Sequence, residues 1–171
     1  MTVPYPNQAI DEDYRNNFGL NRGHLFPSGH AGDDVTAEST FTLTNIVPQK
    51  ITFNSGSWNR MEREISGIMN KLCYDNNKEV LAHVLTGAIP GKNKLNGKVN
   101  IPSHMWMAFC CYKSTGNTFV SEAHWALNVD EHKEKTVIKD SLQKLQEFLS
   151  QQLKTKVQLF HNNCTKKRQG N

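Results

Sequence analysis

Five polar side chains within about forty residues have the chemistry needed to hydrolyse a phosphodiester bond. Arg22 and His24 lie in the segment NRGHL, Asn45 lies in TFTLTNIVPQ, and Asn54 and Glu62 lie in FNSGSWNRME. An imidazole can take a proton from water near neutral pH, because its reference pKa is about 6.5. Carboxamide and carboxylate oxygens suit a hard cation such as Mg²⁺. These residue types therefore predict metal-assisted hydrolysis.

His24 is the candidate general base. One of its ring nitrogens would accept the proton of the attacking water, and the other needs a fixed acceptor that selects the tautomer. We expect that acceptor to be a main-chain carbonyl of the neighbouring strand. The alternative is a structural histidine whose ring only satisfies nearby groups, and the polar residues around His24 favour the base.

Asn54 is the candidate metal ligand, with Mg²⁺ as the expected ion and Mn²⁺ or another divalent cation as the alternative. One protein oxygen can suffice, because Mg²⁺ keeps several waters and takes further oxygens from a substrate phosphate. Glu62 lies about two helical turns later, on the same face, where its carboxylate could hold metal-bound waters. The competing interpretations are a helix N-cap for Asn54 and a solvated glutamate for Glu62.

Arg22 and Asn45 are the candidate supporting residues. On a strand, Arg22 and His24 project to the same side, so the guanidinium could grip phosphate oxygens in a bidentate manner. The amide of Asn45 could orient the water or the phosphate. Gly23 lacks a side chain where a nucleic-acid backbone would approach closely.

The hydrophobic pattern predicts how these residues are positioned. Strands are expected at 22–26 and 39–47, the second from the alternation of Phe41 and Leu43 with threonines, and a polar loop at 27–38 joins them. A helix is expected at 54–72 from the spacing of Trp58, Met61, Ile65, Ile68, Met69 and Leu72.

The remainder of the chain predicts an α+β domain with a mixed or antiparallel sheet flanked by helices. The expected elements are strands at 80–89, 105–112, 119–126 and 156–160, an exposed loop at 90–102, and an amphipathic helix at 137–153. Its length of 171 residues suits one domain spanning the whole sequence. No apolar run approaches the roughly 20 residues of a membrane span, and the N-terminus does not have the pattern of a secretory signal.

Positive charge is concentrated in the second part of the sequence. Residues 1–64 carry a net charge of −3 and residues 65–171 carry +7. Lys92, Lys94 and Lys98 lie in one Gly/Asn-rich loop, and residues 166–168 form a basic tail, so both could attract nucleic acid. The alternative is that these are ordinary solvated side chains.

The four cysteines allow three disulfide pairings and show no zinc-site spacing. Cys110 and Cys111 are adjacent in a predicted strand, so they should point to opposite faces and are not expected to bond the same partner. One of them bonded to Cys73 or Cys164 would suit an oxidising compartment, whereas four reduced thiols would suit the cytosol. The sequence leaves both states open.

The segments NRGHL, TFTLTNIVPQ and FNSGSWNRME resemble the DNA/RNA non-specific endonuclease family, whose ββα-metal motif usually begins Asp-Arg-Gly-His. The segments QAIDEDYR, IPSHMWMAFCCYK, SLQKLQEFLSQQL and VQLFHNNC are similar to the endonuclease domain-containing 1 protein group, so the resemblance spans residues 8–164. It implies a ββα finger with His24 as base and Asn54 as Mg²⁺ ligand, and supporting roles for Arg22, Asn45 and Glu62. It also implies DNA and RNA as substrates and secretion.

Three departures from the family pattern bear on activity. Asn21 replaces the usual aspartate, Ser66 stands where several active members have an arginine that contacts phosphate, and the usual N-terminal strands do not precede the motif. Two hypotheses follow. One is a Mg²⁺-dependent endonuclease with little sequence preference and no obligate protein partner. The other is a catalytically weak or inactive relative that binds nucleic acid or a protein.

Overall fold

The computed structural model describes residues 7–113, 118–131 and 137–165, and the basic residues 166–168 lie outside these ranges. Its strands are β1 (Leu20–His24), β2 (Ile46–Lys50), β3 (His83–Ile89), β4 (Lys94–Leu95), β5 (Val99–Asn100), β6 (His104–Lys113), β7 (Thr118–Leu127) and β8 (Ile138–Asp140). Its helices are η1 (Asp11–Tyr14), η2 (Ser28–His30), α1 (Asp34–Ser39), η3 (Leu43–Asn45), α2 (Ile51–Phe53), η4 (Asn54–Trp58), α3 (Asn59–Leu72), α4 (Leu142–Leu153) and η5 (His161–Cys164).

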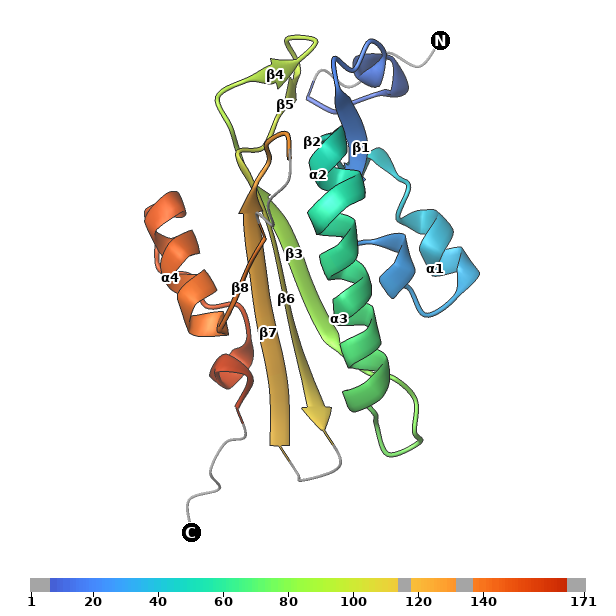
Figure 1. The fold of residues 1–171 in the computed structure, drawn as a ribbon, viewed down its shortest axis with the longest axis vertical. Helices are drawn as coiled ribbons and strands as arrows, with labels where there is room; N and C mark the ends of the chain where they lie inside the picture. Colours follow the sequence, from blue (N-terminus) through green and yellow to red (C-terminus); the bar gives the residue numbers. More distant parts are fainter. Residues whose placement is uncertain (1–6, 114–117, 132–136, 166–171) are drawn as a thin grey trace.

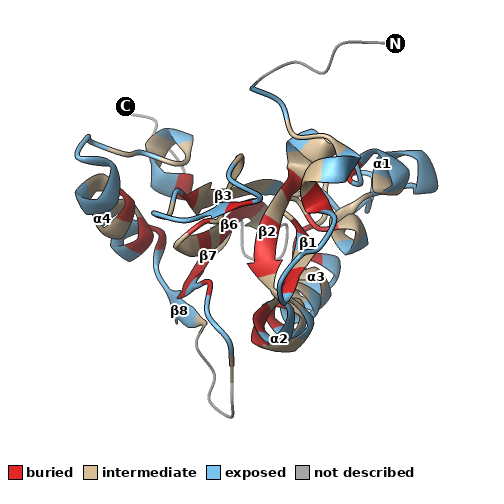
Figure 2. Cartoon of the chain, turned by 90° about the horizontal axis from the view of Figure 1, so that it is seen from above, coloured by how far each residue is buried: buried red, intermediate tan, exposed pale blue. Residues whose placement is uncertain are grey.

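A four-stranded antiparallel sheet with the order β3-β6-β7-β8 forms the centre of the molecule. Seen from above, α3 lies on one side of this sheet and α4 on the other (Figure 2). Two separate two-stranded antiparallel pairs, β1-β2 and β4-β5, lie toward one end of the sheet (Figure 1). The predicted α+β class, with an antiparallel sheet flanked by helices, is confirmed.

Strand β6 supplies the core on both faces of the sheet. One face packs against the apolar stripe of α3 through Met105, Met107, Phe109 and Cys111. The other face packs against α4 through Ala108 and Cys110, together with Trp125 of β7. A strand buried on both sides is therefore apolar at nearly every position, as the sequence MWMAFCCY is.

Two disulfides cross-link the chain, one on each face of β6. Cys73 bonds to Cys111 on the α3 side, and Cys110 bonds to Cys164 on the α4 side. The prediction that the adjacent cysteines point to opposite faces and have different partners is confirmed. The bonds join residues 38 and 54 positions apart, so in the chain-entropy model each stabilises the fold by about 4 kcal/mol.

The pair β1-β2 leads directly into the long helix and forms a ββα finger. In its register, His24 pairs with Ile46 and Gly23 with Val47. The buried side chain of Asn128, which follows β7, ties the finger to the sheet. Its Oδ1 accepts the Lys50 N–H (2.8 Å), and its Nδ2 donates to the carbonyl of Pro48 (3.1 Å).

The structure corrects several predicted element bounds. The second finger strand is 46–50 and not 39–47, because residues 39–45 form the end of α1, a turn and η3, with Phe41 exposed. Helical structure begins at Ile51 and not at Asn54. The exposed loop at 90–102 contains the β4-β5 hairpin, whose Leu95 packs in a small core with Tyr14, Leu20 and Ile46.

The C-terminal prediction is corrected in the same way. Within the expected helix at 137–153, residues 138–140 instead pair with β7 as β8, and the helix begins after the Ser141 N-cap. No strand is found at 156–160, where the backbone forms no ladder. Its apolar residues Val157, Leu159 and Phe160 instead pack as a loop beside α4, which satisfies the hydrophobic pattern without sheet pairing.

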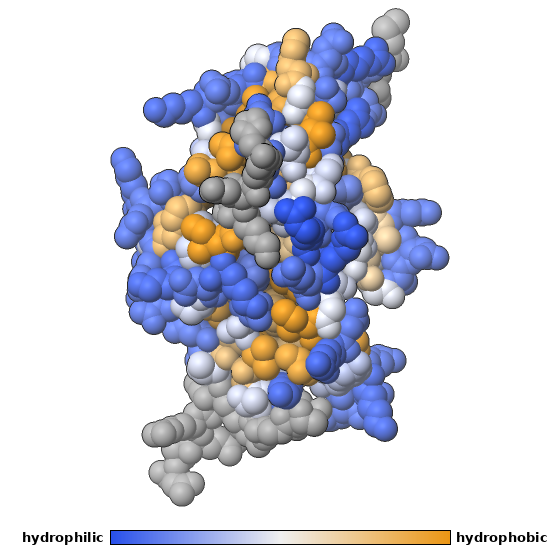
Figure 3. Space-filling view, in the orientation of Figure 1, coloured by the Kyte–Doolittle hydropathy of each residue, from blue (hydrophilic) through white to orange (hydrophobic). Residues whose placement is uncertain are grey.

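Among the described residues, we find no helix with the length and apolar character required to cross a membrane. Figure 3 shows hydrophobic residues along the strip between α4 and α3, with hydrophilic residues on both sides.

Gly23 is required by the packing inside the finger. A Cβ atom added at this position would lie 1.9 Å from Oε1 of Gln49, whose side chain is completely buried. The space that the sequence suggested for a nucleic-acid backbone is thus filled by this glutamine.

We predict that Gly23→Ala destabilises the protein by about 1–3 kcal/mol, because the methyl group must displace the buried Gln49 side chain. The matched control is Gly67→Ala in α3, where an added Cβ meets no atom within 4 Å. Alanine is the better helix former, so the control should gain about 0.5–1 kcal/mol. Urea unfolding with the disulfides intact measures both, and a Gly23→Ala variant as stable as the parent would contradict the packing argument.

Candidate active site

The polar cavity of about 510 Å³ beside α3 brings together three of the predicted site residues. His24, Asn54 and Glu62 all line it. The end of β1 and the turn that includes η2 form one wall, and the start of the long helix forms the other. The remaining lining residues are Pro27, Ser28, Gly29, His30, Ser55, Asn59, Arg63 and Ser66.

The period of α3 explains why its cavity side chains share one face. The buried residues Met61, Ile65 and Met69 of α3 continue, at helical spacing, the stripe that begins at Trp58 of η4, and this stripe packs on β6. The cavity residues of α3 lie at positions 59, 62, 63 and 66, and three of them, 59, 62 and 66, directly follow a residue of the buried stripe. Packing of the apolar stripe thus fixes which side chains point into the cavity.

Asn54 lies within the helix, so the N-cap interpretation is wrong. Its backbone angles are helical (φ −58°, ψ −47°), and it begins the π-helical turn η4, which is distorted at Gly56 (φ −100°, ψ −114°). The carboxylate of Glu131 accepts hydrogen bonds from the main-chain N–H (3.0 Å) and the hydroxyl of Ser57. Glu131, which lies 74 residues after Ser57 in the sequence, therefore stabilises the turn that contains Asn54. Such π-turns often occur at functional sites.

Glu62 combines partial burial with a position in the cavity wall. Burial disfavours its ionised form and raises its pKa from 4.5 to about 7, while the neighbouring Trp58 side chain opposes this shift. The carboxyl group can therefore gain or lose a proton near neutral pH. A cation or a hydrogen-bond donor in the cavity would favour the ionised form.

His24 is held in the neutral form that a general base requires. Burial lowers its pKa, because the charged imidazolium loses hydration. The ring packs edge-on against Phe41, with 4.6 Å between the ring centroids. The expected main-chain acceptor is not found among the described residues: neither ring nitrogen forms a hydrogen bond with them, and Nε2 is buried.

His30 is a cavity residue that the sequence analysis missed. Its Nε2–H donates to the main-chain carbonyl of Glu62 (2.8 Å), so it joins the η2 turn to α3. Burial lowers its pKa, and its Nδ1 has no partner among the described residues. The signal for it is a second histidine six residues after His24, within the polar segment 27–38.

Asn45 organises the loop behind the cavity. Its Oδ1 accepts the Phe26 N–H (3.0 Å), and its Nδ2 donates to the carbonyls of Phe26 (2.9 Å) and Thr40 (2.9 Å). All of these partners are main-chain groups on either side of the loop. The structure therefore places Asn45 where it supports the loop after His24, and it does not line the cavity.

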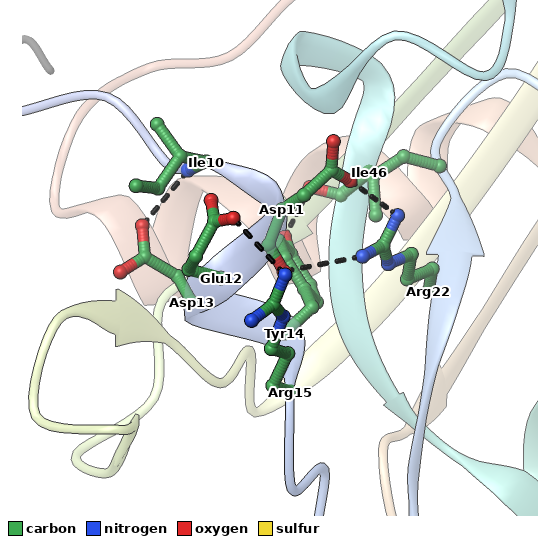
Figure 4. Close-up of polar contacts among 8 residues, drawn as sticks. All are labelled: Ile10, Asp11, Glu12, Asp13, Tyr14, Arg15, Arg22 and Ile46. Atoms are coloured by element: carbon green, nitrogen blue, oxygen red, sulfur yellow. Dashed lines mark hydrogen bonds and ion pairs between the residues drawn. The ribbon is translucent and has the colours of Figure 1, made fainter.

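Arg22 does not line the cavity that contains His24. Its Nη1 pairs with Oδ1 of Asp11 (2.6 Å), its Nη2 donates to the Asp11 carbonyl (3.2 Å), and its guanidinium lies 5.3 Å from the Tyr14 ring centre. Figure 4 shows the guanidinium of Arg22 on β1 directed toward Asp11 of η1. Asp11 thus supplies a carboxylate for Arg22 where Asn21 cannot. A direct role for Arg22 toward phosphate stays a prediction.

The three predicted lysines lie around the β4-β5 hairpin and not in the cavity. Lys92 and Lys94 line a second hollow of about 600 Å³ together with Lys50, Phe18 and Leu127. Lys98 forms an ion pair with Asp13 (2.7 Å). Lysines 92 and 94 therefore remain candidates for contact with a long polyanion.

The cavity suits a cation that takes few ligands from the protein. Its oxygen donors include the Asn54 carboxamide and the Glu62 carboxylate. The part of the chain that the structure describes has no group of three or more His, Cys, Asp or Glu side chains able to hold a metal ion. The oxygen donors of Asn54 and Glu62 are of the kind that Mg²⁺ takes alongside waters and phosphate oxygens.

The family model for DNA/RNA non-specific endonucleases matches residues 2–159. The chain belongs to this family. The human (Homo sapiens) endonuclease domain-containing 1 protein is 28% identical over 158 residues, which cover 92% of this chain and 28% of the relative. The mouse (Mus musculus) protein of the same name is 31% identical over 159 residues, with coverage of 92% and 28%.

A mitochondrial nuclease and a solved structure extend this comparison. The mouse mitochondrial nuclease EXOG is 33% identical over 125 residues, covering 68% of this chain and 33% of the relative. The chain thus spans about a third or less of the length of these curated relatives. A chain in the crystal structure of the EndoG/EndoGI complex has the same fold, with a TM-score of 0.67 and 20% identity over 94% of this chain and 66% of that chain.

We predict that Glu62 makes stability depend on pH. Below pH 4.5 the carboxyl is protonated in both the folded and the unfolded protein, so its burial then does not lower the free energy of unfolding. Between pH 4.5 and about 7 the unfolded chain ionises first, so the stability of the parent falls relative to Glu62→Gln and levels off above the folded pKa. The loss is expected to reach about 3 kcal/mol. Urea unfolding of both proteins from pH 4 to 8 measures it, and a constant difference would show that Glu62 is not desolvated.

Proposed function

We propose that this protein is a Mg²⁺-dependent endonuclease that hydrolyses phosphodiester bonds in DNA and RNA with little sequence preference. The observation that supports this best is the convergence of His24, Asn54 and Glu62 on one polar cavity. Membership of the non-specific endonuclease family supports the reaction class.

His24 would act as the general base in this reaction. Its lowered pKa keeps the imidazole unprotonated at neutral pH, ready to take a proton from the attacking water. Asn45 would contribute indirectly, because its three hydrogen bonds hold the loop that follows His24.

Asn54 and Glu62 would hold the cation, directly through the carboxamide and through bound waters at the carboxylate. When bound, Mg²⁺ supplies positive charge that stabilises the phosphate oxygens as negative charge develops on them. The rigid π-turn at Asn54 and its link to Glu131 would keep the ligand in place.

The same cavity accounts for weak sequence preference. Its lining residues offer imidazole, carboxamide, hydroxyl and guanidinium groups that suit phosphate and metal. Phosphate contacts carry no direct sequence information. Lys92 and Lys94 would attract flanking parts of the polyanion from the side of the hairpin.

The two disulfides support an oxidising location such as the cell exterior.

We predict that His24→Ala lowers the rate of Mg²⁺-dependent cleavage by about 100-fold or more, because proton removal by a positioned base typically contributes that much. Nicking of plasmid DNA and digestion of structured RNA, with and without EDTA, measure the effect. The control is His83→Ala, which removes an exposed histidine of β3. Equal nicking by His24→Ala and the parent would refute the base, and no cleavage by the parent in any divalent cation would favour a binding protein.

We also predict that Asn54→Ala abolishes metal-dependent cleavage and weakens Mn²⁺ binding, measured by calorimetry or by Mn²⁺ electron paramagnetic resonance. Because Asn54 does not cap the helix, the substitution should leave the helix intact, and the circular dichroism spectrum of the variant should match that of the parent. Asn76→Ala, in the exposed turn after α3, is the matched control. Unchanged Mn²⁺ binding by Asn54→Ala would place the cation elsewhere.

A further inference from the structure

Arg63 has an unusual position among the arginines that the structure describes. Arg15 pairs with Glu12 (3.2 Å) and Arg22 pairs with Asp11 (2.6 Å). Arg60 lines a different hollow, together with Glu64 and Lys139. Arg63 lines the cavity of His24, Asn54 and Glu62, and no carboxylate within the described part of the chain forms an ion pair with it.

The guanidinium of Arg63 is held by a neutral partner. The Oδ1 atom of Asn59, one helical turn earlier, accepts hydrogen bonds from Nε (2.9 Å) and Nη2. A guanidinium has five N–H donors, so three of them remain, two on Nη1 and one on Nη2. These two nitrogens form the fork that matches two oxygens of one phosphate.

The choice of partner preserves the positive charge. A carboxylate at position 59 would neutralise the guanidinium, whereas a carboxamide restricts its rotation without cancelling its charge. Asn59 also lines the cavity, so both residues belong to the same wall. An exposed arginine in this arrangement is ordered in advance and lacks a counter-ion, which favours an anionic ligand.

We propose that Arg63 binds the non-bridging oxygens of a substrate phosphate through its Nη1/Nη2 edge and that Asn59 positions it. The ligand class is a nucleic-acid backbone, and this inference rests on the proposed endonuclease function. Ser66 lies three residues later on the same wall, and its small side chain leaves room for the phosphate.

The test measures binding separately from cleavage. In a His24→Ala background that carries the full chain, Arg63→Ala should weaken binding of a fluorescent single-stranded oligonucleotide about tenfold or more. The slope of log K against log salt should become shallower by about 0.7, the value for one phosphate contact in a single strand. Arg63→Lys should retain most of the slope but not the affinity, because an ammonium cannot form the fork. Arg60→Ala, on the neighbouring face, is the matched control and should change neither.

Two further measurements address position and chemistry. Asn59→Ala should weaken binding less than Arg63→Ala while leaving the salt slope intact, because the charge remains but is less well ordered. With an oligonucleotide whose central phosphate is a neutral methylphosphonate, the effect of Arg63→Ala should shrink severalfold. Circular dichroism and thermal melting confirm that each variant is folded.

The outcomes separate this inference from the proposed function. If the parent cleaves and Arg63→Ala binds and cleaves like Arg60→Ala, the role of Arg63 is refuted while the endonuclease stands. If the parent does not cleave in any divalent cation but Arg63→Ala still loses affinity and salt dependence, the endonuclease fails while Arg63 is upheld as a phosphate-binding residue.

Discussion

The packing of α3 on β6 is the constraint on which the candidate site depends. Trp58, Met61, Ile65 and Met69 are buried against methionines and Phe109 of β6, and each such side chain contributes about 1.5–3 kcal/mol. The helix therefore cannot rotate about its axis without exposing this stripe. The adjacent face, which has Glu62 and three other cavity residues, is fixed with it. Cys73, bonded to Cys111, further holds the C-terminal end of the helix on the same strand.

A second consequence of this packing is the altered chemistry of Glu62. The carboxyl lines the cavity on the face of α3 next to the buried stripe, and burial removes part of its hydration. The folded protein thus keeps a group that costs free energy when it ionises at neutral pH. Ionisable residues with a strongly shifted pKa are common at functional sites, although they lower stability. A cation in the cavity would offset the cost, which couples metal binding to deprotonation.

The sequence predicted the parts of the site that depend on local periodicity. The apolar spacing from Trp58 to Leu72 identified the helix and placed Asn54 and Glu62 near one another, and β1 placed His24 at the end of a strand. The same kind of reasoning failed at 39–47. The alternation of apolar residues with threonines predicted a strand, but residues 39–45 form the end of α1, a turn and η3, and the Asn45 side chain bonds to the Thr40 carbonyl. Alternation alone cannot distinguish a strand from a loop whose polar groups are satisfied by a single side chain.

Contacts between distant parts of the chain could not be predicted at all. Glu131 stabilises the π-turn at Asn54 across 74 residues, and Asn128 joins the finger to the sheet across 78 residues. The pairing of Arg22 with Asp11 likewise depends on η1 folding back over β1. Each partner is a common polar residue in an irregular segment. Its role therefore follows only from the tertiary fold.

The distribution of charge around the cavity shows why an arginine matters there. Burial keeps both imidazoles neutral, and Glu62 is anionic once it ionises. Arg22 is already paired with Asp11, and Lys92 and Lys94 lie near the β4-β5 hairpin. A phosphate entering the cavity would then meet positive charge only from a bound cation and from Arg63, among the residues that line it. With Glu62 ionised, its negative charge and the positive charge of Arg63 cancel, so the cavity is close to neutral before ligands bind. The charge that a divalent cation then adds would be balanced in part by the substrate phosphate, which makes binding of metal and substrate mutually favourable.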